Sequence, residues 1–128
     1  MQNRSKGNSS IMSEPLKEYL LEGVFKEDYL LAPRVSKYTN NGTLYILLTG
    51  EDDEPFCDLT VNLPSDQISD KSKPNLAFVD TNSNQWLPKF IERYSLGKPT
   101  GFYGFGCNCV YPEYEFDLSK LNEGLPEY

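Results

Sequence analysis

Residues 41–49, Asn-Gly-Thr-Leu-Tyr-Ile-Leu-Leu-Thr, decide the fold class of this chain. The Asn41-Gly42 dipeptide suits a tight hairpin, because both central residues of such a turn adopt positive φ. The run 44–48 is apolar on both faces of an extended strand, which predicts a central strand at 43–49 that is covered on both sides. Its hairpin partner is the extended stretch 29–38, bent at Pro33.

Short apolar runs separated by turn residues continue on both sides of this hairpin, a pattern typical of consecutive antiparallel strands. Further strands are predicted at 19–25, 56–63, 76–79 and 113–118. In the strand 56–63, Cys57, Leu59, Val61 and Leu63 share one face, and Asp58, Thr60 and Asn62 share a face expected to be wet.

One helix is predicted after these strands. Its apolar residues recur at the spacing of a single helical face, with Asn84 as the expected N-cap and Gly97 as the expected terminator. These residues are Trp86, Leu87, Phe90, Ile91 and Tyr94. We therefore expect an α+β fold, with an antiparallel β-sheet of about five to six strands packed by one principal helix.

The chain length of 128 residues suits one domain. Residues 1–13 contain Arg4 and Lys6 but no acid and little that can be buried, so we expect a flexible N-terminal arm at 1–13 and a single α+β domain at 14–128. The sequence leaves open whether translation starts at Met1 or at Met12. No segment has the apolar length of a membrane span or of a signal peptide, which predicts a cytoplasmic protein with no membrane partner.

The composition argues against several kinds of chemistry. The chain has no histidine and carries 19 acidic against 12 basic residues, for a net charge of −7. It therefore lacks the commonest general base and metal ligand at neutral pH. No catalytic motif is complete, and we expect a non-enzymatic protein. The acidic balance also predicts no direct binding to nucleic acid, although the aromatic segment 101–106 is similar in composition to the RNA-binding strand of RRM domains.

Two short motifs suggest metal ligands without completing a site. Asp80-x-Asn82-x-Asn84 matches the start of a calcium loop of the EF-hand type, but Gln85 and Ile91 stand where that loop needs glycine and a bidentate acid. Cys107-x-Cys109 lacks the second ligand pair of a structural zinc site. With Cys57 these two make an odd number of cysteines, which fits free thiols in a reducing compartment. No metal and no cofactor is expected.

The carboxylates are the remaining signal, and they form two groups. One projects from a predicted hairpin tip, and the other falls on one side of a predicted strand at intervals of about 6.8 Å. Such rows could imitate a nucleic-acid backbone and occupy a basic surface of another protein, whereas a solvated turn and a solvated sheet face explain them without any partner. The candidate partner-binding residues are Glu51, Asp52, Asp53, Glu54, Glu113, Glu115 and Asp117.

Two other interpretations stay open. An aromatic-lined pocket could bind or process a small ligand or carbohydrate. Its candidate residues are Trp86, Phe102, Tyr103, Phe105 and Tyr111. Alternatively, the protein is a structural assembly partner whose aromatic edge self-associates. The sequence leaves the oligomeric state open.

Several segments also carry a family resemblance. They are Val35-Ser-Lys-Tyr38, Asn40-Asn-Gly42, Leu59-Thr-Val-Asn-Leu-Pro64, Ala77-Phe-Val-Asp-Thr-Asn82, Pro99-Thr-Gly101 and Tyr111-Pro-x-Tyr-x-Phe-Asp-Leu118. Together they resemble a small family of domains of unknown function, of the DUF4313 type, carried on bacterial plasmids, phages and integrative elements. The resemblance implies no catalytic residues. It implies a mobile-element setting, in which small acidic proteins often disable host restriction or CRISPR nucleases, so we expect an anti-restriction or anti-CRISPR protein that occupies the basic groove of a host nuclease.

Overall fold

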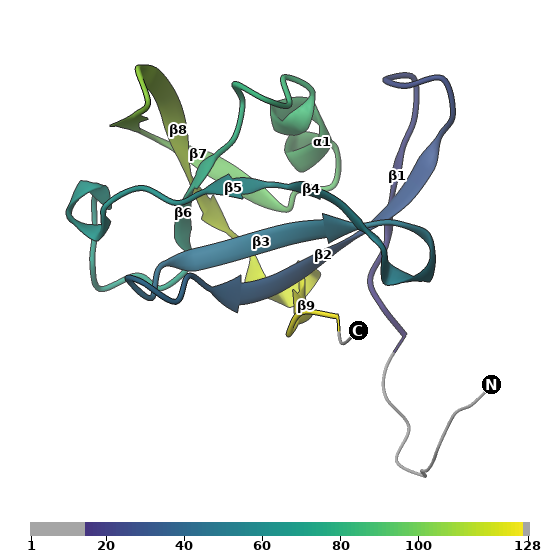
Figure 1. The fold of residues 1–128 in the computed structure, drawn as a ribbon, viewed down its shortest axis with the longest axis horizontal. Coiled ribbons are helices and arrows are strands. Elements are labelled where there is room, and N and C mark those ends of the chain that lie inside the picture. Colours follow the sequence, from purple (N-terminus) through teal and green to yellow (C-terminus); the bar gives the residue numbers. More distant parts are fainter. Residues whose placement is uncertain (1–14, 127–128) are drawn as a thin grey trace, which may run out of the picture.

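The strands of the protein form two sheets, as seen in a computed structural model that describes residues 15–126 (Figure 1). The first sheet has the order β1 (Tyr19–Leu21), β2 (Tyr29–Lys37), β3 (Leu44–Thr49) and β4 (Pro55–Asp58), with β9 (Asn122–Glu123) pairing parallel to β2. The second has the order β5 (Thr60–Val61), β6 (Leu76–Val79), β8 (Cys109–Phe116) and β7 (Gly97–Gly106). Within the described residues, α1 (Leu87–Arg93) is the only α-helix. The α+β class is confirmed, while the strands divide between two sheets instead of forming one.

The β2–β3 hairpin is the pairing predicted from residues 41–49. Val35 lies opposite Ile46 in its antiparallel register. The turn is longer than a two-residue turn, because the Tyr38 amide donates to the Thr43 carbonyl at 2.9 Å and closes a loop of residues 39–42. Gly42 adopts a φ of 73° there, which glycine tolerates without steric cost.

The predicted strand 56–63 joins the two sheets. Its first part, β4, pairs with β3, and its second part, β5, pairs with β6. Leu59 lies between them, where its amide donates to the Ile46 carbonyl and its carbonyl accepts from the Asp80 amide, both at 2.9 Å. The expectation that Thr60 faces water is wrong. It is buried at this junction, and its hydroxyl oxygen accepts from the Ile46 amide at 3.1 Å.

The main core lies between the two sheets and α1. The helix contributes Leu87, Phe90 and Ile91 to it. Trp86, and not Asn84, occupies the N-cap position of α1. The helix also ends before Gly97, because Ser95 adopts a φ of 53° and the Leu96 amide donates back to the Ile91 carbonyl at 3.0 Å.

The β7–β8 hairpin extends beyond the main core. Cys107 and Asn108 form its turn, both with positive φ, as a two-residue turn between twisted strands requires. One face of this hairpin packs on a second, smaller core of Leu63, Phe78 and Tyr111.

None of the helices in residues 15–126 is long and apolar enough to cross a membrane. The arm predicted at residues 1–13 lies outside the described residues.

Candidate functional site

The turn between β3 and β4 carries the first predicted acidic group. It contains the 3₁₀ turn η1 (Glu51–Asp53) and is closed by hydrogen bonds from the Gly50 amide to the Glu54 carbonyl, at 2.8 Å, and from the Glu54 amide to the Glu51 carbonyl, at 3.1 Å. Glu51, Asp52 and Glu54 are exposed. They form no ion pair with any residue in 15–126.

Asp53 holds this turn on the body of the protein. Arg34 of β2 donates to one carboxylate oxygen in an ion pair, and the Thr49 hydroxyl of β3 donates to the other at 2.7 Å. Asp52 and Asp53 both adopt positive φ, of 56° and 60°, which is unfavourable for residues other than glycine and persists only where surrounding contacts fix it. Asp53 is therefore a fixed anchor, and its neighbours point their charges outward.

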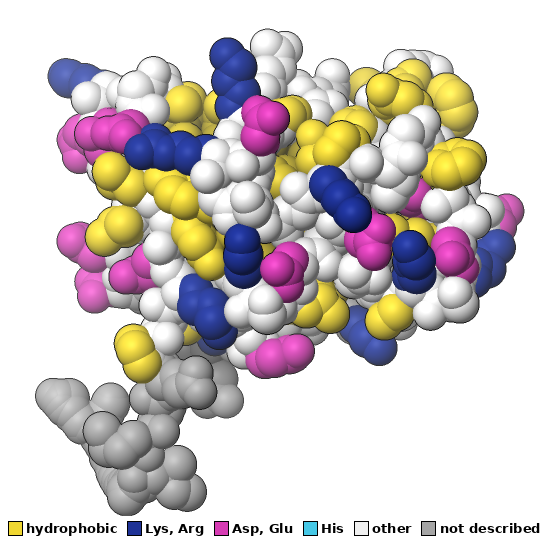
Figure 2. All heavy atoms as spheres, turned by 180° about the vertical axis from the view of Figure 1, so that it is seen from behind, with side chains coloured by type: hydrophobic (Ala, Val, Ile, Leu, Met, Phe, Trp, Pro, Cys, Tyr) yellow, Lys and Arg dark blue, Asp and Glu magenta, His cyan; other side chains and the backbone are white. Residues whose placement is uncertain are grey.

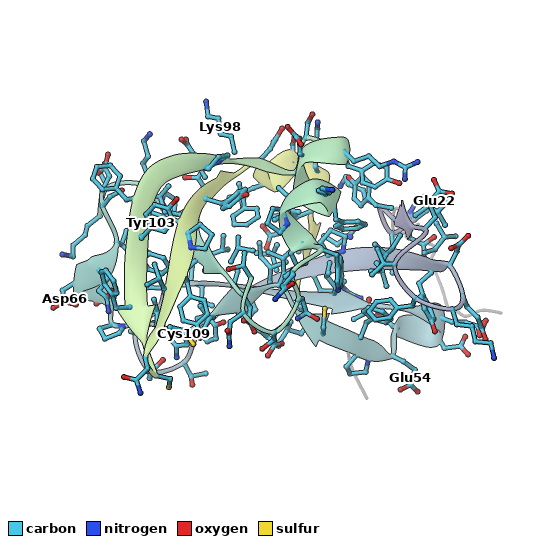
Figure 3. All side chains as sticks on the ribbon, turned by 90° about the horizontal axis from the view of Figure 1, so that it is seen from above. Glu22, Glu54, Asp66, Lys98, Tyr103 and Cys109 are labelled. Carbon is cyan, nitrogen blue, oxygen red and sulfur yellow. The ribbon has the colours of Figure 1, made fainter. Side chains whose placement is uncertain are left out.

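A second acidic segment, residues 22–28 between β1 and β2, lies at the same end of the molecule. Figure 3 places Glu22 and Glu54 at this end, and Asp66 and Tyr103 at the opposite end. Glu22, Glu27 and Asp28 are exposed, and Glu22 pairs with Arg93 at 2.7 Å. We call the exposed carboxylates here the acidic end: Glu22, Glu27, Asp28, Glu51, Asp52 and Glu54.

Aromatic rings lie within the acidic end. Phe25 is 46% exposed, and its ring packs edge-on against Tyr29, Phe56 and Trp86, with centroid separations of 6.2, 5.9 and 6.1 Å. Phe25 was expected at the end of a strand over 19–25, but β1 ends at Leu21. The sequence does contain a signal for an exposed aromatic residue here. Phe25 stands directly before the charged turn residues 26–28, where a core residue is not expected.

The second predicted acidic row does not exist as a solvated row. Glu113 is fully buried, because residues 62–75 cover this face of the second sheet. Glu115 pairs with Lys73 at 3.5 Å. Asp117 lies beyond the end of β8 and accepts hydrogen bonds from the Ser119 amide and hydroxyl, which lower the pKa of Asp117. The prediction that Glu113 faces a partner is wrong.

Hydrogen bonds to the protein replace water around the Glu113 carboxylate. One oxygen accepts from the Ser69 amide at 2.9 Å, and the other accepts from the hydroxyls of Ser69 at 2.6 Å and Thr100 at 2.7 Å. Buried carboxylates are tolerated when their oxygens are satisfied in this way. Glu113 thus ties residues 62–75 to β7.

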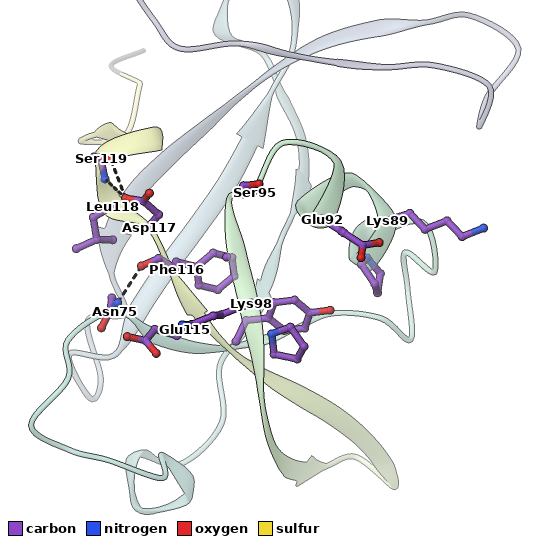
Figure 4. A pocket seen from close by; sticks show the side chains of 14 residues that line it. Asn75, Lys89, Glu92, Ser95, Lys98, Glu115, Phe116, Asp117, Leu118 and Ser119 are labelled. Atoms are coloured by element: carbon purple, nitrogen blue, oxygen red, sulfur yellow. Dashed lines mark hydrogen bonds between the residues drawn. The ribbon is translucent and has the colours of Figure 1, made fainter.

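The residues of the predicted aromatic pocket are not brought together. Trp86 packs in the aromatic cluster of the acidic end, and Tyr111 is buried in the small core. Phe102, Tyr103 and Phe105 lie exposed on β7. An open groove of about 990 Å³ does lie between α1, β7 and the end of β8 (Figure 4), with Glu92, Lys98 and Asp117 at its rim, but none of the five predicted aromatic residues lines it.

The segment 80–84 forms the turn that leads from β6 to α1. The Asp80 carboxylate accepts from the Ser83 amide at 3.1 Å, and the Asn84 amide donates to the Asp80 carbonyl at 3.1 Å. The Asp80 carboxylate, the first residue of the motif that resembles a calcium loop, is thus engaged in a local turn contact. In the described part of the chain, no group of three or more His, Cys, Asp and Glu residues is placed to hold a metal ion.

Comparison with known proteins identifies the family to which the chain belongs. A family model described as a domain of unknown function, DUF4313, matches residues 32–127. The chain belongs to this family. No curated protein and no solved structure matches the chain.

Proposed function

We propose that this member of the DUF4313 family is a non-enzymatic binding protein that docks its acidic end onto a basic surface of a partner protein. One observation carries the proposal: exposed carboxylates flank an exposed aromatic cluster on turns that the fold holds in place. Glu27 and Asp28 follow Phe25 closely in the chain, and Glu54 precedes Phe56.

The two kinds of side chain have different tasks in such a contact. Exposed carboxylates attract a basic surface from a distance and align it, but add little affinity each, because water and salt screen them. A partly exposed aromatic cluster supplies the apolar centre that gives an interface most of its binding energy. Phe25, supported by Phe56 and Trp86, provides such a centre.

Within this proposal, the partner is a host enzyme that handles nucleic acid, such as a restriction or CRISPR nuclease. A groove that binds phosphates is lined with Lys and Arg and presents the basic surface that the acidic end requires. The protein would inhibit the enzyme by occupying that groove. The net charge of −7 supports this choice of partner, and so does the mobile-element setting that we expect from the family resemblance.

The test measures binding to a panel of purified restriction and CRISPR nucleases at low and at raised salt. A triple variant, Glu51→Gln, Asp52→Asn and Glu54→Gln, removes the exposed charges of the turn while keeping side-chain size. We expect affinity to fall with salt, and to fall about tenfold or more in this variant.

A matched control removes the same charge elsewhere, through Asp66→Asn, Glu92→Gln and Glu123→Gln, all exposed and in no ion pair within residues 15–126. This control should bind as the wild type does. A panel in which no nuclease binds at low ionic strength refutes the choice of partner, and equal losses in both triple variants refute the acidic end as the site.

A further inference from the structure

The β7–β8 hairpin exposes large apolar side chains on one face. Phe105 lies directly opposite Val110, and Tyr103 lies opposite Pro112, so these side chains share a face of the sheet. Tyr103 is 58% exposed, Phe105 64% and Val110 51%. Phe102, in the irregular segment before them, is 60% exposed. We call Phe102, Tyr103, Phe105 and Val110 the aromatic strip.

Figure 2 shows hydrophobic side chains gathered at the corner of the molecule where this hairpin lies. The exposed parts of the four side chains amount to roughly 400 Å² of apolar surface, an area at which a patch on a monomer commonly marks an interaction site. Single exposed apolar residues need no explanation, but four such residues on one hairpin, three of them on the same face, do.

Exposure of the strip does not reflect a loosely packed hairpin. On the opposite face, a Cβ at Gly104 would lie 2.6 Å from Leu63 and 2.8 Å from Phe78, and a Cβ at Gly106 would also lie 2.6 Å from Leu63. Gln67 also holds the outer edge of β7, because its side chain accepts from the Phe105 amide at 2.7 Å and donates to the Phe105 carbonyl at 3.0 Å. Glycines thus face the interior while aromatic rings face water, on a hairpin fixed from two sides.

The absence of charged residues around the aromatic strip limits which kinds of partner can cover it. Residues 99–112 contain no charged residue, although the protein as a whole carries −7. A nucleic acid or a strongly charged protein surface finds no complementary charge there. A second copy of the chain does match, because strip-to-strip contact joins two uncharged surfaces. The acidic ends, which repel each other, lie at the other end of each copy (Figure 3).

We propose that two copies of the protein associate through their aromatic strips, in a twofold arrangement that places the same face of each hairpin against the other. The strips alone would bury at most about 800 Å² in total, half of a standard protein interface of about 1,600 Å². An interface of this area is small, so the dimer is weak and dissociates on dilution.

The test is sedimentation equilibrium of the protein alone over a concentration series from about 1 µM to about 1 mM. The wild type should pass from monomer to dimer. The variant Tyr103→Ser/Phe105→Ser should raise the dissociation constant about thirtyfold or more, because truncation of aromatic hot spots has effects of that size. The control Val24→Ser/Leu30→Ser changes apolar residues of 41% and 54% exposure outside the strip and should dimerise as the wild type does.

A pair of charge variants distinguishes a disrupted dimer contact from a misfolded protein as the cause of lost dimerisation. Phe105→Glu and Phe105→Lys should each be monomeric, because like charges meet across the twofold, and a mixture of the two should associate again. A wild type that stays monomeric at the highest concentration, or a Tyr103→Ser/Phe105→Ser variant that dimerises unchanged, overturns the proposal. So does a monomeric wild type that binds neutral phosphatidylcholine vesicles, which would assign the strip to a lipid surface. These outcomes do not involve the acidic end, so the two proposals fail separately.

Discussion

Replacing Glu113 tests whether its buried carboxylate ties residues 62–75 to β7. Glu113 is fully buried, it forms no ion pair within residues 15–126, and it accepts one hydrogen bond from an amide and two from hydroxyls. Two replacements separate the roles of charge and hydrogen bonding. Glu113→Gln keeps the size and removes the charge, while Glu113→Ala removes every acceptor.

The geometry around the two oxygens sets the expected magnitudes. In the glutamine variant, the amide oxygen can face the Ser69 amide while the NH₂ group faces the two hydroxyls, which can turn to accept. All three contacts survive without charge assistance, and the cost of burying a charge disappears, so we expect a change within about 1 kcal/mol. In the alanine variant, Ser69 and Thr100 lose their partner and a cavity opens, so we expect a loss of about 3 to 5 kcal/mol.

Urea unfolding at neutral pH measures both values, as shifts in midpoint at constant slope. Thr100→Val in each background supplies a control, because its effect should be smaller once Glu113 is alanine. Part of the effect should remain there, since the Thr100 hydroxyl oxygen also accepts from the Phe102 amide at 3.2 Å. Equal losses in the glutamine and alanine variants would refute the hydrogen-bond reasoning. An alanine variant as stable as the wild type would refute the burial of Glu113 itself.

Three further outcomes follow from packing and burial. Gly104→Ala should lower the free energy of unfolding by about 1 to 3 kcal/mol, because the added Cβ would meet Leu63 and Phe78. Gly50→Ala, whose Cβ would have no atom within 4 Å, should lower the free energy of unfolding by less. Urea unfolding of the two variants compares these losses. Burial raises the pKa of the Cys57 thiol to about 12, so a thiol reagent followed by mass spectrometry should label the exposed Cys107 long before Cys57. Burial also raises the pKa of Tyr38 above its usual value of 10.0. The stability that the neutral, buried Tyr38 contributes is thus complete below pH 10 and is lost as the pH rises through the folded-state pKa. Thermal unfolding should therefore show less alkaline destabilisation in Tyr38→Phe than in the wild type.

Local apolar patterns were sufficient to predict several elements of the fold. The strands β2, β3 and β6 lie within one or two residues of the ranges expected, because each is a short apolar run bounded by turn residues. The helix was found from one apolar face, since Leu87, Phe90 and Ile91 are all buried. These patterns depend only on neighbours in the chain, which a single sequence contains.

Features of the fold that depend on contacts between distant segments could not be predicted from the sequence in this way. Alternation along β8 shows that Glu113 and Glu115 share a face, but not that residues 62–75 fold over that face. The polarity of that segment suggested a solvated connection, whereas the Ser69 hydroxyl in it donates a hydrogen bond to the buried Glu113 carboxylate. Likewise, the clean alternation of 56–63 could not reveal that the strand leaves one sheet at Leu59 and enters the other.

The same change of sheet separates the two proposed surfaces. The acidic turn follows β3 in the first sheet, and the aromatic strip lies on β7 and β8 in the second, so the chain between Leu59 and Val61 joins two ends of different chemistry. In a strip-to-strip dimer the acidic ends point away from each other. Such a dimer engages one partner at each end, or one partner with two basic sites at an avidity that neither site gives alone. Because the proposed dimer is weak, this gain would depend on protein concentration, and the aromatic strip would then adjust how strongly the acidic end binds the proposed partner.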